Sequence, residues 1–263
     1  MPRTLGGFRP LTPIGADAGK GGATAAFTPA SISGLVAWYD FSDAATLFTN
    51  SARTTPVASD GDAIGGVTDK SGNVAHLASS LTARPLYKTA IQNGKSIARF
   101  DGSNDLLSAT LTHNITTGNF YIAGVIASGV NASGAWKSLL AFGSYEPALY
   151  LHSSTNATEW VAWLLGTTTF TASAYTDSTD YLFEWYRSAA TSVSLRLNGG
   201  SADTVVASSV SIANNTFSLC SDSAAGGAYG ALDIGEILVY NTLPSAEQRD
   251  AIRAYLNAKW AVY

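Results

Sequence analysis

The sequence has few of the residues that most often build cross-linked or reactive sites. It contains one cysteine, Cys220, and three histidines among 263 residues. A single cysteine excludes an intrachain disulfide, and because Cys220 lies in the strand-like segment 216–220 it is predicted to be a small core residue. His76, His113 and His152 lie on separate segments without the spacing of a metal site.

Charge is scarce as well. Charged residues make up 13% of the chain, and 15 basic against 19 acidic residues give a net charge of −4. That charged fraction is about half the usual share, so the surface must be rich in Ser, Thr, Asn and Gly. No basic block or basic-aromatic stripe follows the pattern of a phosphate-binding protein, and we expect no nucleic-acid partner.

Long apolar runs and catalytic motifs are also missing. The longest runs, such as 35–39, are far too short to span a membrane. We find no Gly-x-Ser-x-Gly, no phosphate-binding Gly-Lys-Ser/Thr loop and no His-Glu-x-x-His. A glycosidase needs two carboxylates beside one bond, but the strands containing Glu184 and Glu236 supply no second one, so we expect no enzyme activity. If the face of Glu236 is buried, its carboxylate needs a donor such as Arg99 or a backbone amide.

Residues 1–30 lack any helix or strand period. They contain Pro at four positions and Gly at six, a composition typical of a disordered linker, and no continuous apolar core of a secretory signal. A segment of this kind can become ordered by lying on a partner. We therefore interpret residues 1–32 as an extended arm that docks through Phe8, Arg9, Pro10, Leu11, Pro13 and Ile14.

From residue 33 to 240 the pattern is that of a β protein. The alternation over 193–197, followed by Asn198-Gly199-Gly200, predicts a hairpin. Eleven or twelve short strands with regular turn signals predict a sandwich of two antiparallel sheets. The predicted strands are 34–40, 84–87, the strand before residue 101, 120–127, 138–142, 148–152, 160–165, 181–186, 192–198, 204–211, 216–220 and 233–240, with the segment 65–73 between the first two.

The end of the chain, 245–263, is helical. Ile252, Tyr255, Leu256 and Trp260 repeat at i, i+3, i+4 and i+8, which predicts one apolar stripe docked on the sandwich. Ser245 and Gln248 have the spacing of a capping box.

The segment 96–107, SIARFDGSNDLL, changes its period halfway and predicts strand, turn and strand. One interpretation is a hairpin corner, because Asp-Gly favours a tight turn. The other is a cation site, with Asp101, Asn104 and Asp105 directing oxygens at calcium.

Aromatic residues offer a second candidate site. Six Trp and twelve Tyr are present, and an aromatic ring can stack on a pyranose while Asp and Asn bind its hydroxyls. Trp136, Tyr145, Trp160 and Tyr175 lie in or beside predicted loops. They are candidates for binding a glycan, with a place in the core as the alternative for each.

Five motifs in order give the chain a family resemblance. They are GLVAWYDFSDAATL (34–47), DKSGN (69–73), RPLY (84–87), ARFDGSNDLL (98–107) and the ending 234–260. Over residues 33–263 the chain resembles the laminin-G-like, concanavalin-A-like jelly-roll domains of tailed-phage virion proteins and bacterial surface proteins. The resemblance implies an all-β, two-sheet antiparallel jelly-roll sandwich with adjacent first and last strands, used for contact with glycans or proteins.

Two functions stay open from the sequence. In the first, the protein is a non-enzymatic phage structural protein on the virion surface: a capsid decoration, head fibre or tail appendage. Its arm would dock on the major capsid or tail protein, and a homo-oligomer would bind host-surface glycans weakly. In the second, it is a bacterial extracellular carbohydrate-binding or adhesion module. An initial Met followed by the arm without a secretion signal favours the first.

Overall fold

The computed structural model describes residues 27–80, 82–113, 115, 119–129, 136–143, 147–153, 158–163, 167–170, 174–189, 191–206, 215–223 and 226–263. The arm residues 8–14 and Tyr145 lie outside the described residues, so the predictions for them are not addressed by the structure.

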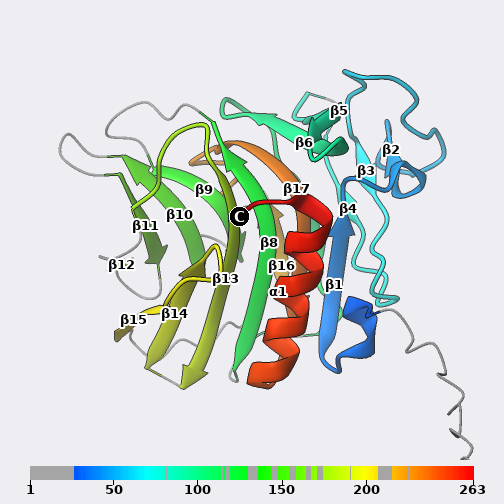
Figure 1. Ribbon diagram of the computed structural model, residues 1–263. Helices are drawn as coiled ribbons and strands as arrows, with labels where there is room; N and C mark the ends of the chain where they lie inside the picture. The colour runs from blue at the N-terminus through cyan, green and yellow to red at the C-terminus, as the bar shows by residue number, and fades with distance from the viewer. Residues whose placement is uncertain are drawn as a thin grey trace, which may run out of the picture.

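The described chain forms two antiparallel sheets (Figure 1), as predicted. The eight-stranded sheet has the order β15-β14-β13-β8-β17-β6-β5, with β1 also paired to β17. Its strands are β1 (Leu35–Asp40), β5 (Leu86–Gln92), β6 (Lys95–Asp101), β8 (Phe120–Ser128), β13 (Asp180–Ala189), β14 (Ser192–Leu197), β15 (Asp203–Val206) and β17 (Ala231–Tyr240).

The nine-stranded sheet has the order β12-β11-β10-β9-β16-β7-β4-β3-β2. Its strands are β2 (Leu47–Phe48), β3 (Gly66–Val67), β4 (Leu77–Ala78), β7 (Leu107–Thr110), β9 (Trp136–Phe142), β10 (Ala148–Ser153), β11 (Thr158–Trp163), β12 (Thr167–Phe170) and β16 (Thr216–Leu219). Two short 3-10 helices, Pro29–Ser31 and Ala44–Thr46, precede β1 and β2 respectively.

The main core lies between the two sheets and follows from the period of the strands. In β13, Phe183 and Trp185 point into this core, whereas Leu182 and Tyr186 belong to a second apolar cluster on the other face. Neighbouring residues of a strand point to opposite faces, so each face of the eight-stranded sheet has its own cover. The predicted hairpin is confirmed, because β14 pairs with β15.

The second cluster is covered by helix α1 (Ala246–Trp260), which lies across the front of the eight-stranded sheet in Figure 1. The predicted capping box is present, since Ser245 Oγ accepts the Gln248 amide and the Gln248 side chain accepts the Ser245 amide. Trp260 packs on Gly235 so closely that a Cβ there would lie 2.8 Å from the indole ring. No helix of the described chain is long and apolar enough to cross a membrane.

The first and last strands lie side by side, as the resemblance implies: β1 pairs with β17 from Leu35 to Asp40. The segment just before β1 also belongs to the packed structure. Phe27 contacts Tyr255 with ring centroids 5.8 Å apart, and Ile32 is buried in the second cluster. The packed part of the chain therefore begins ahead of the predicted boundary at residue 33.

The hairpin predicted for 96–107 is wrong. Strand β6 pairs with β5 and β17 in one sheet, whereas β7 pairs with β4 and β16 in the other. The turn between β6 and β7 thus carries the chain from one sheet to the other. Alternation shows that two strands flank a turn, but it does not show whether they pair with each other.

Candidate functional site

A hollow of about 400 Å³ lies on the outer face of the nine-stranded sheet, at β4 and β7. Ala78 and Ser108 are paired there, and their neighbours Leu77 and Leu107 point into the main core, so the paired residues face outward. None of the lining residues carries a charge. They are Ala78, Ser79, Ser80, Thr82, Ala83, Asn104, Leu106, Ser108 and Tyr229.

The turn between β6 and β7 fixes the position of Asn104. Asp101 Oδ1 accepts the amides of Ser103 at 2.8 Å and Asn104 at 3.2 Å, and Asp105 Oδ2 accepts the Asp101 amide at 3.0 Å. Asn104 Nδ2 donates to the Thr82 carbonyl at 3.0 Å. The side chain of Asn104 is therefore tied to the rim of the hollow, with its carbonyl oxygen left over.

Most of the polar groups in the hollow have no partner among the residues that the structure describes. Among the described residues, nothing bonds the hydroxyls of Ser80, Thr82, Ser108 and Tyr229, nor Oδ1 of Asn104. A site that combines free hydroxyls, one amide oxygen and an aromatic ring, without charge, suits a polar uncharged ligand that is rich in hydroxyl groups.

The predicted calcium ligands are used differently in the structure. Asp101 and Asp105 each direct a carboxylate oxygen at a backbone amide of their own turn, and burial is the main cause that raises the pKa of the Asp105 carboxyl. No group of three or more His, Cys, Asp or Glu residues in the described chain could hold a metal ion. These bonds support the turn interpretation, and calcium binding by Asp101, Asn104 and Asp105 stays a prediction.

Two of the predicted glycan-binding aromatics are core residues. Trp160 and Tyr175 are at most 1% exposed and belong to the main core. The Trp160 ring packs edge-on against Tyr181, with centroids 5.7 Å apart, and also contacts Phe183. Neither Trp160 nor Tyr175 offers a face to a sugar, because strand alternation turns Trp160 inward and the core encloses both rings.

Trp136 is placed on the surface side, but in strand β9 rather than in a loop. It is half-buried on the outer face of the nine-stranded sheet, edge-on to Tyr150 with centroids 5.5 Å apart. Its partner across the strands is His152, whose ring centroid lies 4.2 Å away, and His152 is in turn paired with Glu159. Trp136 therefore belongs to an outward aromatic patch on the same face of the nine-stranded sheet as the hollow.

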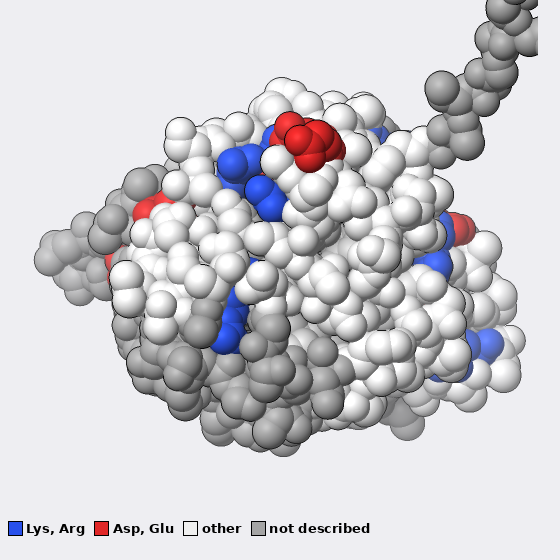
Figure 2. Space-filling model, turned by 90° about the horizontal axis from the view of Figure 1, so that it is seen from below, with Lys and Arg blue, Asp and Glu red and all other residues white. Residues whose placement is uncertain are grey.

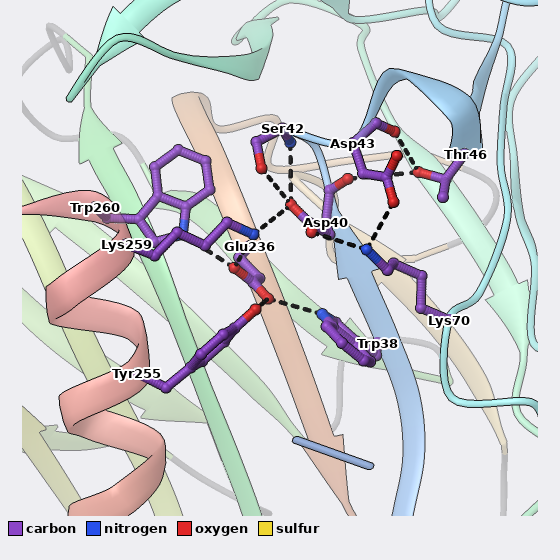
Figure 3. A network of polar contacts seen from close by, with 10 residues as sticks. All are labelled: Trp38, Asp40, Ser42, Asp43, Thr46, Lys70, Glu236, Tyr255, Lys259 and Trp260. Atoms are coloured by element: carbon purple, nitrogen blue, oxygen red, sulfur yellow. Dashed lines mark hydrogen bonds and ion pairs between the residues drawn. The ribbon is translucent and has the colours of Figure 1, made fainter. Parts of the chain in front are cut away.

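The two buried glutamates of the eight-stranded sheet hold helix α1 in place. Glu236 is fully buried and accepts four donors (Figure 3): Trp38 Nε1 at 2.7 Å, Tyr255 OH at 2.9 Å, Lys259 Nζ at 2.7 Å and Trp260 Nε1 at 3.0 Å. The expected structural bond is thus present. Arg99 is not its donor, because Arg99 pairs with Asp233 instead.

Glu184 has the same role further along the sheet. It accepts Tyr121 OH at 2.8 Å and the Arg253 guanidinium at 2.8 and 3.2 Å. Burial and then the negative charge of Glu184 raise the pKa of Tyr121, and hydrogen bonding to Glu184 raises that of Arg253. Both glutamates are therefore committed to donors from α1 and its neighbours.

Asp40, at the end of β1, extends the Glu236 network (Figure 3). Lys259 bridges Asp40 and Glu236 at 2.7 Å each, and Lys70 bridges Asp40 and Asp43 at 3.0 and 2.7 Å. Burial would raise the pKa of the Asp40 carboxyl, but Lys259, Ser42 and Lys70 outweigh it, so the pKa lies below its usual value. The DKSGN motif contributes Lys70 here, which makes it a structural motif.

Sequence reasoning missed Tyr229, Ser80 and Ser108 as site residues. Tyr229 lies in Gly226–Gly230, a GGAYG segment whose only sequence signal is an aromatic residue among glycines. The serines carry no signal at all in a chain whose surface is rich in serine. Only the pairing of β4 with β7 brings them together with Asn104.

Comparisons with known proteins identify the fold. No family model matches the chain, and no curated protein is similar to it in sequence. Solved structures do match: a GH54 α-L-arabinofuranosidase variant soaked with 4-nitrophenyl α-L-arabinofuranoside has a TM-score of 0.62 at 12% identity, covering 86% of this chain and 63% of that one.

Two further solved structures match the fold of this chain. The botulinum neurotoxin serotype D ligand-binding domain in complex with N-acetylneuraminic acid has a TM-score of 0.56 at 12% identity, covering 86% of this chain and 52% of that one. An arabinofuranosidase complexed with arabinofuranosyl-α-1,2-xylobiose has a TM-score of 0.56 at 12% identity, covering 75% and 51%. This chain spans between half and two thirds of the length of these three proteins. At such identities the likeness concerns the fold alone: the chain is a two-sheet antiparallel jelly-roll β-sandwich with one C-terminal helix.

Proposed function

We propose that this protein is a carbohydrate-binding jelly roll, and that the hollow at β4 and β7 is its glycan site. The observation that carries the proposal is the set of hydroxyl and amide groups in the hollow that have no partner within the described chain. Proteins of similar fold were solved with N-acetylneuraminic acid and with an arabinofuranosyl xylobiose, which supports a carbohydrate ligand.

The chemistry of the hollow favours a neutral glycan. Neither Lys nor Arg lines it, so a sialic acid carboxylate would lose its hydration there without gaining a cation. Tyr229 supplies the ring, and Asn104 Oδ1 and Ser108 supply acceptors for sugar hydroxyls. Figure 2, which views the molecule from below, shows a surface with few charged side chains, which also suits hydrated and uncharged partners.

We propose further that the protein binds glycans without cleaving them. A glycosidase needs one carboxylic acid and one carboxylate free to act on the same bond. Glu184 and Glu236 are both engaged by cationic donors from α1, and no acidic residue lines the hollow. Release of reducing ends from any glycan that binds would contradict this part of the proposal.

The place of action that we propose is the surface of a phage virion. The five motifs of the jelly-roll resemblance and the Pro/Gly-rich segment before residue 27 support it. Docking on a major capsid or tail protein would present several copies together, and multivalency can raise avidity by roughly 10²–10⁴ over a weak single site. A bacterial extracellular adhesion module is the alternative, and labelling of purified particles with an antibody to the jelly roll separates the two.

A glycan array tests the binding proposal. We expect the monomer to bind neutral glycans weakly and a multimer, made by fusion to a trimeric scaffold, to bind the same glycans strongly. Asn104→Ala and Tyr229→Phe should each weaken binding, whereas Tyr263→Phe, at an exposed tyrosine outside the hollow, should not. Absence of glycan binding by both the monomer and the multimer would contradict a carbohydrate function.

A further inference from the structure

We propose that the segment Gly226–Gly230, which we call the glycine strap, is a movable cover over a longer groove. With the strap lifted, the hollow continues across the outer face of the nine-stranded sheet to Trp136. The extended groove would take a neutral glycan chain of several residues. This inference rests on the proposed function and specifies the class of ligand that the site accepts.

A continuous row of small residues forms the floor of the groove. Five cross-strand neighbours follow one another over β4, β7, β16, β9 and β10, and adjacent strands lie about 4.8 Å apart, so the row is about 19 Å long. Its first two members line the hollow. The row consists of Ala78, Ser108, Ser218, Ala141 and Ala148.

Two serines under this face have polar atoms that nothing satisfies. Ser218 lies in the row and Ser138 is paired with Tyr150 on the same face. Both side chains are fully buried, and neither Oγ has a hydrogen-bond partner among the described residues. Buried hydroxyls are normally bonded, so a floor with two unbonded hydroxyls is one that gains hydrogen bonds when a hydroxyl-rich ligand reaches it.

The glycine strap reaches both ends of this part of the row. Its Ala228 packs against the outer cluster that contains Ala141, and its Tyr229 lines the hollow beside Ser108. Ser218 is paired with both Ala141 and Ser108, so it lies between the outer cluster and the hollow, and in the closed state proposed here the strap passes over it. Lifting it would join the hollow to the Trp136 patch.

The contacts of the strap allow it to move as a unit. One described backbone bond joins its middle to strand β9, from the Ser138 amide to the Ala228 carbonyl at 2.7 Å. The other described bonds join the strap to the preceding residues 220–223. Gly227 O accepts Ser221 Oγ and the Asp222 amide, the Gly226 amide donates to Ser223 O, Gly226 O accepts Ser223 Oγ, and the Gly230 amide donates to Cys220 O.

The strap also adopts backbone angles that only glycine adopts readily. Gly226 has φ +96° and Gly227 has φ +148°, and Ala228, at φ +42°, is strained for a residue with a Cβ. One backbone bond ties the middle of the strap to β9, and strain at Ala228 opposes the closed position, which favours a populated open state.

Hydrogen exchange on the ligand-free protein tests the strap directly. The amide of Ser138 is protected by Ala228 O, whereas the amides of Ser218 and Leu219 are protected within the sheet. We expect the Ser138 amide to exchange at least tenfold faster than those of Ser218 and Leu219, measured residue by residue by NMR. Equal protection at these three positions would overturn the proposal, whatever the glycan array shows.

Chain-length dependence tests the groove. The probes are xylose, xylobiose and xylohexaose, with glucose, cellobiose and cellohexaose beside them. We expect affinity to rise at least tenfold from the monosaccharide to the hexasaccharide in one of these series. Ser218→Ala should abolish that rise and leave monosaccharide binding unchanged, whereas Ser108→Ala should weaken both.

The outcomes separate this proposal from the proposed function. Ser218→Ala removes a hydroxyl without a partner, so the fold should keep its melting temperature and any loss of affinity reports the groove. Binding that is equal for one and six sugar residues, or a Ser218→Ala variant that keeps the gain with length, would overturn the groove but leave the hollow as a glycan site. No binding of any sugar, with fast exchange at Ser138, would overturn the glycan ligand and retain the strap.

Discussion

Replacing Glu236 by Gln should destabilise the protein more than any change to its exposed charges. Glu236 is fully buried and accepts hydrogen bonds from Trp38, Tyr255, Lys259 and Trp260, and so joins β1, β17 and α1. A glutamine has the same shape, but its amide nitrogen cannot accept. The substitution therefore isolates the carboxylate from the packing around it.

The hydrogen bonds of Glu236 determine how much unfolding free energy the Glu236→Gln variant should lose. The amide nitrogen is best placed on the side of Tyr255, whose hydroxyl can reverse and accept, so Trp38 Nε1 loses its acceptor. A buried donor left unsatisfied costs about 1–3 kcal/mol. Lys259 loses a charged partner but keeps Asp40 at 2.7 Å, so the whole loss, the Trp38 donor included, stays in the lower half of the 3–5 kcal/mol that is typical for a broken buried pair. We expect about 3–4 kcal/mol in total.

Urea unfolding followed by tryptophan fluorescence measures this free energy, and calorimetry should show a melting temperature lower by about 6–15 °C. The matched control is Asp250→Asn on the same helix, where the Asp250 side chain is 68% exposed and pairs with Arg253. It should cost under about 0.5 kcal/mol. If Glu236→Gln costs no more than this control, the reasoning about the buried network is refuted.

Three further predictions concern pH, the N-terminal segment and calcium. The pKa of the Asp40 carboxyl is lowered in the folded state, so the stability that Asp40 contributes is complete above the ordinary pKa of 3.8 and is lost as the pH falls below that value. Unfolding free energies measured against pH should lack this acid-dependent loss in Asp40→Asn, and a pH profile equal to that of the unchanged protein would contradict the role of Asp40. Deleting residues 1–26 should leave the melting temperature unchanged and prevent incorporation into particles. Deleting residues 1–32 also removes Phe27 and Ile32 from the second cluster and should lower the free energy of unfolding by about 2–4 kcal/mol. Equal melting temperatures of the two truncated proteins would show that residues 27–32 do not stabilise the fold. Calcium binding by the turn between β6 and β7 would raise the free energy of unfolding by RT ln(1 + [L]/Kd). Since the carboxylates of this turn already accept backbone amides, we expect the same melting curve in millimolar calcium and in a chelator. A higher melting temperature in calcium would support the cation site.

The local parts of the fold could be predicted because their signals lie within a few residues. The capping box needs only Ser245 and Gln248, three positions apart, and both of its bonds are present. The hairpin of β14 and β15 follows from one alternating run and one glycine turn. For the same reason the helix end and most strands lie within a few residues of their predicted bounds, while the two-residue strands β2 and β4 were too short to show a period.

The candidate site could not be predicted in this way. Trp160 is a candidate from the sequence because it lies beside a predicted loop, and strand alternation places it in the core, which was the alternative. Asn104 is a candidate cation ligand from the sequence because three oxygens lie close together there, but its side chain is tied to Thr82 on another segment. Tyr229 reaches the same hollow from a third segment, and nothing in the sequence near it indicates that contact.

By itself the sequence determined the strand period, the turns, the helix cap and the low surface charge, because each depends on side chains that are neighbours along the chain. The tertiary structure alone decided that β6 and β7 belong to different sheets, that Glu236 receives donors from β1 and α1, and that Asn104, Ser108 and Tyr229 share one hollow. These are contacts between distant segments, and they are fixed by which strands pair and which faces are buried rather than by any local preference.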